Sequence, residues 1–139
     1  MATVIRAEIS EKNKYYVDKH RYYELKHFCL QYGEWKKARI SYTDSIIFAT
    51  SYEQMPGDGA PSDLTAKYAI LRAQCDEKIK LVERIAKESD EYLYDYILKA
   101  VTEGLAYTYL KSKLNIPCSR DMYYDRYRKF FWLLNQARN

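Results

Sequence analysis

The stretch Leu114–Leu134, LNIPCSRDMYYDRYRKFFWLL, places six aromatic rings and four cations in one short segment that opens with Asn-Ile-Pro. Such a segment is either an apolar packing helix with a solvated back or a helix that lies against a charged polymer. Pro117 disfavours helical geometry at Ile116, and Asn115 tolerates the left-handed conformation that often closes a helix. Ser119 then offers a hydroxyl that can cap a second helix. The stretch therefore predicts a turn followed by a helix.

A helix is also predicted immediately before this turn. Leu105, Tyr109 and Leu114 can form its inner face, and Lys111 and Lys113 then fall outside. Two helices joined by a turn of about four residues are the helix-turn-helix arrangement of DNA-binding proteins. The sequence therefore predicts an all-α helical bundle with a helix-turn-helix at its C-terminal end.

In a helix-turn-helix, the second helix enters the major groove by its N-terminal half. The spacing places four side chains of that helix inward, namely Tyr123, Tyr127, Phe130 and Leu134. Arg120, Tyr124 and Arg128 share another face and would point toward DNA, where arginine can pair with guanine edges. We therefore expect a helix-turn-helix over about 105–138. Its predicted DNA-binding residues are Lys111, Lys113, Ser119, Arg120, Tyr124, Arg126, Arg128 and Lys129.

The charge distribution points to the same end of the chain. The net charge is +4, but residues 111–139 hold seven basic and two acidic side chains, whereas the rest of the chain holds 16 basic and 17 acidic ones. A basic excess confined to one terminus is typical of a surface that faces a polyanion. The alternative is that this basic amphipathic helix is only a solvated face of the bundle.

The composition fits one soluble domain that spans residues 1–139. Four glycines and three prolines are too few for a β-fold with many tight turns. No apolar run reaches the roughly 18 residues of a membrane span, and the N-terminus lacks the apolar region of a secretory signal. Three widely spaced cysteines fit reduced thiols. We therefore expect a cytoplasmic protein without a membrane partner.

The N-terminal third predicts one clear helix and one ambiguous segment. Apolar positions recur at helical spacing over Tyr15–Tyr32, and Gly33 is expected to end that helix. We expect this helix to pack against a later long helix, although its Tyr and His side chains also suit a dimer or partner surface. Glu34–Ile40 fits a short turn of helix. Residues 41–61 fit a strand or a short helix followed by a loop. Because a connection of about 20 residues without structure would be unusual, we expect a short helix within Asp44–Glu53.

The middle of the chain predicts two further helices. Ser62 is a plausible N-cap for a long helix whose apolar seam runs at three- and four-residue spacing over Leu64–Ala86. Ser89 or Asp90 can then cap a new helix that ends near Gly104. The seam residues are Leu64, Tyr68, Leu71, Cys75, Ile79, Val82 and Ala86.

No arrangement of residues points to a metal, a cofactor or catalysis. His20 and His27 are seven residues apart on one helix, and Cys29 points in a different direction from His27. Cys118 lies at a helix start, but no histidine–carboxylate arrangement accompanies it. Nucleotide-binding and nucleophile-elbow motifs are absent from the sequence. We therefore expect a protein that is not an enzyme and that holds no metal or cofactor.

The segments KNKYYVDKHRYYELKHFCLQYGEWKK (12–37) and VTEGLAYTYLKSKLNIPCSRDMYYDRYRKFFWLL (101–134) resemble a family of small proteins of phages and prophages of Gram-positive bacteria. The shared features are the Ile-Pro-Cys turn, paired aromatics at Tyr123–Tyr124 and the RKFFWLL end. That family is in turn similar to the RinA and ArpU late transcriptional regulators, whose C-terminal segment resembles the helix-turn-helix that sigma factors use. The resemblance implies a phage-encoded DNA-binding regulator.

Three functions are therefore considered. The leading hypothesis is a transcriptional regulator that binds double-stranded DNA, with the N-terminal helices as a scaffold and a contact surface for RNA polymerase or for a second copy in a homodimer. The second is a small protein that binds and inhibits or adapts a host protein, for which the same aromatic and basic helix would imitate or cover a nucleic-acid channel. A structural role in virion assembly ranks last.

Overall fold

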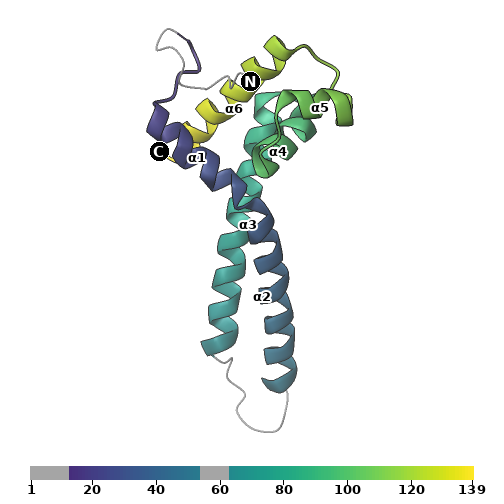
Figure 1. Ribbon diagram of the computed structural model, residues 1–139. Helices are drawn as coiled ribbons and strands as arrows, with labels where there is room; N and C mark the ends of the chain where they lie inside the picture. The colour runs from purple at the N-terminus through teal and green to yellow at the C-terminus, as the bar shows by residue number, and fades with distance from the viewer. Residues whose placement is uncertain (1–12, 54–62) are drawn as a thin grey trace. The chain divides into compact units, whose positions relative to one another are not determined.

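Within residues 13–53 and 63–139, which the computed structural model describes, every regular element is an α-helix (Figure 1). The all-α prediction is therefore confirmed for these residues. The helices in chain order are α1 (Lys19–Leu30), α2 (Tyr32–Glu53), α3 (Asp63–Ser89), α4 (Tyr94–Glu103), α5 (Tyr107–Leu114) and α6 (Arg120–Ala137).

The chain divides into two compact units. The core unit comprises Met1–Gln31 and Val82–Asn139, and the hairpin unit comprises Tyr32–Leu81. The core unit therefore contains α1, α4, α5, α6 and the last part of α3. The hairpin unit contains α2 and the first part of α3.

The core unit is built where α1, α4 and α6 pack against one another. The Tyr22 ring of α1 lies edge-on to Phe131 of α6, with the ring centroids 5.0 Å apart, and its hydroxyl shares a hydrogen bond with the Tyr127 hydroxyl. The Arg21 guanidinium donates to the Asn135 side-chain oxygen over 2.7 Å and ties the two helices a second time. The first helix, α1, therefore packs mainly against α4 and α6, whereas the sequence led us to expect the long helix as its partner.

The inward face of α6 matches the spacing in the sequence. Tyr123, Phe130 and Leu134 are buried, and Phe131 joins them. Tyr127 is half-buried, and its ring lies 5.0 Å from that of Phe131. Edge-to-face ring pairs of this kind contribute about 0.5–1.5 kcal/mol each beyond the area that they bury. The predicted inner face of this helix is therefore confirmed.

The hairpin unit differs from the predicted boundaries. Gly33 does not end a helix but lies in the first turn of α2, which continues to Glu53, so the segment 41–53 is helical and contains no strand. The predicted first helix is accordingly shorter and ends at Leu30. A single glycine near a helix boundary does not show whether one helix ends there or the next helix begins, because backbone N–H or C=O groups lack intrahelical partners in both cases.

The α3 helix follows the predicted seam with one exception. It runs from Asp63 to Ser89, and Ile79, Val82 and Ala86 are buried, but Leu64 is largely exposed at the start of the helix. The expected cap at Ser62 lies outside the described residues. Inside the hairpin unit, α2 and α3 run side by side in opposite directions (Figure 1).

The sharp end of α4 is fixed by a left-handed glycine. Gly104 has a φ of 71°, and the N–H groups of Gly104 and Leu105 both donate to the Ala100 carbonyl oxygen. This pattern closes a helix and satisfies its free carbonyl groups. The predicted helix end at Gly104 is confirmed.

Two glycine-to-alanine substitutions should therefore have opposite effects. We expect Gly104→Ala to lower the free energy of unfolding by about 1–2 kcal/mol, because a side chain is strained at that positive φ. We expect Gly33→Ala to raise it by about 0.5 kcal/mol, because Gly33 is helical and no heavy atom lies within 4 Å of the added Cβ. Thermal unfolding followed by circular dichroism measures both changes. Equal destabilisation by the two substitutions would contradict this account of the α4 end.

Candidate nucleic-acid interface

The turn between α5 and α6 is held from inside the core unit. Asn115 adopts the left-handed conformation with a φ of 54°, and Ile116 beside it is completely buried. The Tyr107 hydroxyl, at the start of α5, donates to the Cys118 carbonyl oxygen over 2.6 Å. These contacts fix the path of the chain from Asn115 to Ser119. The helix, left-handed residue and following helix that the sequence predicted are therefore present.

The first turn of α6 is capped as the sequence predicted. The Ser119 hydroxyl oxygen accepts a hydrogen bond from the Met122 N–H over 3.2 Å. The remaining free N–H groups of a helix start attract anions, since they carry the positive end of the helix dipole. The guanidinium carbon of Arg120 lies 5.3 Å from the centre of the Tyr107 ring. Arg120 is thus exposed and also supported by an aromatic face.

Three exposed cations flank this turn. Lys111 and Lys113 lie in the last turn of α5, and Arg120 is the first residue of α6. We call Lys111, Lys113 and Arg120 the basic turn. None of the three takes part in an ion pair with another described residue. Their charges are therefore free to meet an external anion.

Tyr124 does not lie on the outward face of α6, where the sequence placed it. Its side chain is 8% exposed, and its ring contacts those of Tyr107, Tyr123 and Tyr127. The expectation that Tyr124 points toward DNA is wrong in this respect. A spacing of four residues from Arg120 indicates a common side of the helix but not how far the core extends around it.

Arg126 is already paired within the protein. Its Nε donates to an Asp90 carboxylate oxygen over 2.9 Å, and its Nη1 donates to Asp125 over 2.5 Å. Arg128 and Lys129 are half-buried, and the Arg128 Nε is buried without a hydrogen-bond partner. Of the predicted DNA-binding residues, the structure therefore leaves the basic turn exposed, with Ser119 as its cap.

Asp90 is the residue that sequence reasoning missed as a partner of the C-terminal helix. Its Oδ1 accepts the N–H groups of Tyr92 and Leu93, and its Oδ2 accepts from Arg126. Burial on its own would raise the pKa of Asp90, but these three hydrogen bonds hold the pKa below its ordinary value. The sequence indicated Asp90 only as a local cap, because nothing in it links two residues 36 positions apart.

The Asp90–Arg126 pair predicts an acid-sensitive contribution to stability. A carboxyl group with a lowered pKa stabilises the folded protein above its unfolded pKa of about 3.9, and that stabilisation is lost as the pH falls through the folded pKa. We expect Asp90→Asn to lower the free energy of unfolding at pH 7 by about 1–3 kcal/mol, since Arg126 then loses its main charged partner. The difference from wild type should shrink below about pH 4.

Urea unfolding at a series of pH values measures this difference. Glu91→Gln is the matched control, because it removes the same charge from the adjacent exposed residue. If Asp90→Asn and Glu91→Gln behaved alike at pH 7, the ion pair would contribute nothing measurable.

The two cysteines of the core unit both have raised pKa values. Burial raises the pKa of the Cys118 thiol, nearby Asp90 raises it further, and Lys111 opposes both. Burial also raises the pKa of Cys29 strongly.

Among the described residues, no three His, Cys, Asp or Glu side chains gather where they could hold a metal ion. None of the helices in that part of the chain is long and apolar enough to cross a bilayer.

Comparisons of the chain with protein-family models, with curated proteins and with solved structures gave no match.

Proposed function

We propose that this chain binds double-stranded DNA through a helix-turn-helix formed by α5, the turn and α6, and that it acts as a transcriptional regulator of the phage type. The observation that carries the proposal is the basic turn, three exposed cations that flank a capped helix N-terminus and form no ion pair with another described residue. The charge, the cap and the order of the elements support it.

In this proposal, the residues of the basic turn contact DNA phosphates. Lys111 and Lys113 reach from the end of α5, while Arg120 and the free N–H groups at the start of α6 offer a second set of donors. Contacts of this kind position a protein on the duplex without reading its sequence. They also make the affinity depend on salt, because each neutralised phosphate releases counterions.

Base contacts in this proposal come from the exposed first turn of α6. Asp121 and Met122 are both exposed there, and they replace the buried Tyr124 in this role. A carboxylate can accept a hydrogen bond from the cytosine amino group, and an apolar side chain can contact the thymine methyl group. Arg126 makes no base contact in this proposal but stabilises the position of α6, because it is hydrogen-bonded to Asp90.

Neutralising the two lysines of the basic turn provides the test. We expect Lys111→Gln with Lys113→Gln to weaken binding to duplex DNA about tenfold or more and to reduce the slope of log affinity against log salt by about 2. Fluorescence anisotropy with a labelled duplex, repeated over a range of salt concentrations, measures both quantities.

The matched control is Lys19→Gln with Lys99→Gln, which removes the same charge from exposed positions of the core unit at α1 and α4. The control should keep nearly all of the affinity. An equal loss in the two double variants would mean that only net charge matters, and that the turn is not the binding surface.

A second candidate function rests on the acidic residues of α6. Asp121 is exposed and Asp125 half-buried, four residues apart on one side of the helix, so this face carries both signs of charge. Mixed charge also suits a module that binds a host protein. Such a module would retain a host protein from a lysate treated with nuclease and would give only weak, salt-sensitive binding to every duplex.

A further inference from the structure

The hairpin unit exposes large apolar side chains. Ile40 is 63% exposed and Ile47 is 60% exposed, both on α2. These two residues are seven positions apart and therefore share one side of the helix. Only one charged residue, Asp44, occurs between them. Two helices on their own cannot cover apolar side chains on their outer surfaces, so the described residues of the hairpin unit leave this side of α2 uncovered.

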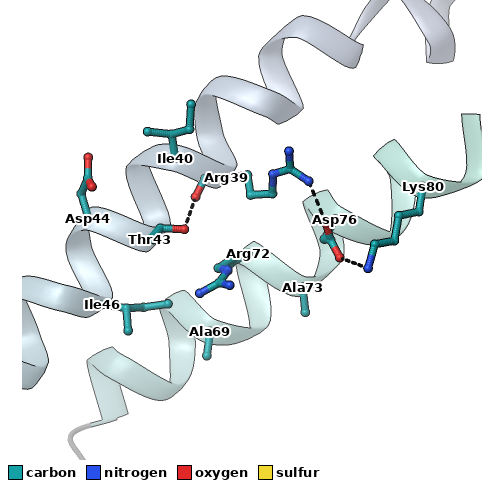
Figure 2. A pocket seen from close by; sticks show the side chains of 10 residues that line it. All are labelled: Arg39, Ile40, Thr43, Asp44, Ile46, Ala69, Arg72, Ala73, Asp76 and Lys80. Atoms are coloured by element: carbon teal, nitrogen blue, oxygen red, sulfur yellow. Dashed lines mark hydrogen bonds and ion pairs between the residues drawn. The ribbon is translucent and has the colours of Figure 1, made fainter. Parts of the chain in front are cut away.

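A groove of about 730 Å³ lies between α2 and α3, and Ile40 is part of its wall (Figure 2). On the α2 side its wall includes Ile40, Thr43 and Ile46, and on the α3 side it includes Ala69 and Ala73. The α3 wall is low at these two positions, because both side chains are alanine methyl groups, whereas Arg72, Asp76 and Lys80 form the rest of that wall. A groove with one bulky and one small wall can accept a bulky helix face on its small side.

The charges around the groove are paired except for two. Asp76 lies 2.8 Å from both the Arg39 guanidinium and the Lys80 ammonium, so one carboxylate serves two cations (Figure 2). Asp44 of α2 and Arg72 of α3 also line the groove, and neither forms an ion pair with any described residue. The groove therefore offers one free negative and one free positive charge.

We propose that this groove binds the same groove of a second copy of the chain, so that two hairpins form a four-helix bundle. A twofold axis along the hairpin would place α2 of each copy against α3 of the other, with both hairpins pointing the same way. Asp44 of one copy then pairs with Arg72 of the other, twice in each dimer. The same charges would repel in an arrangement that stacks α2 on α2.

The sizes of the side chains support the same arrangement. The Arg39–Asp76 pair and the contact of the Tyr42 and Tyr68 rings fix which levels of α2 and α3 lie beside each other. At these levels, Ile40 of one copy meets Ala73 of the other, and Ile47 meets the stretch around Ala69. Bulky residues opposite small ones allow helices to pack closely, as in antiparallel and parallel bundles. Phe48 is also exposed and lies one helical turn after Asp44, so it adds apolar area on the same side of α2. Ile70 is exposed on α3.

The test exchanges the two free charges between chains. We expect the wild-type chain to be a dimer in sedimentation equilibrium, and Asp44→Arg and Arg72→Asp to weaken that dimer by at least tenfold when each is measured alone. In a dimer of either variant alone, like charges face each other at both contacts. Mixing the two variants should restore a dimer of near wild-type affinity, because the mixed dimer has an opposite-charge pair at both contacts. Circular dichroism of each variant verifies that the helices are intact.

Each outcome decides the proposal. A wild-type chain that stays monomeric at all concentrations overturns it. So do single variants that dimerise as well as wild type, since another surface must then be responsible. A mixture that behaves as the sum of its parts also overturns it, because the two charges would then interact within one chain. None of these measurements contains DNA, so they stand or fall independently of the proposed DNA binding.

Discussion

The packing of α1 against the inward face of α6 is the interaction on which the core unit depends. Tyr22 meets Phe131 and shares a hydrogen bond with Tyr127, so one side chain of α1 joins the aromatic row of the C-terminal helix by both its ring and its hydroxyl. Because these rings lie 105 or more residues apart in the chain, they close the N-terminal segment onto the C-terminal one. The turn before α6 is then presented on a fixed helix, which is what a binding surface requires.

The aromatic and basic residues of α6 divide between two tasks. Most rings are part of the core. The Tyr107 ring is buried and also contacts the Arg120 guanidinium, and its hydroxyl donates a hydrogen bond to the Cys118 carbonyl oxygen in the turn. The cations divide as well. Arg126 is used to bind Asp90 inside the protein, whereas Arg120 stays free for an external partner.

Local signals predicted the C-terminal half well. Asn115, Ser119 and Gly104 were each expected to end or begin a helix, and backbone geometry at a helix end depends on the few residues that form it. Side-chain partners far along the chain could not be predicted. The burial of Tyr124 and the pairing of Asp90 with Arg126 arise from the packing of separate helices, which periodicity does not record. The exposure of the basic turn is observed, and its role in DNA binding stays a prediction.

The most direct measurement of the central claim is a titration of the ¹⁵N-labelled chain with a short duplex of mixed sequence, followed by ¹H–¹⁵N correlation spectra at low salt. We expect the largest shifts in the backbone amides from Lys111 to Met122, where the basic turn and the start of α6 lie, and small shifts in α2. Uniformly small shifts, or shifts confined to the hairpin unit, would contradict the claim that this turn is the nucleic-acid interface.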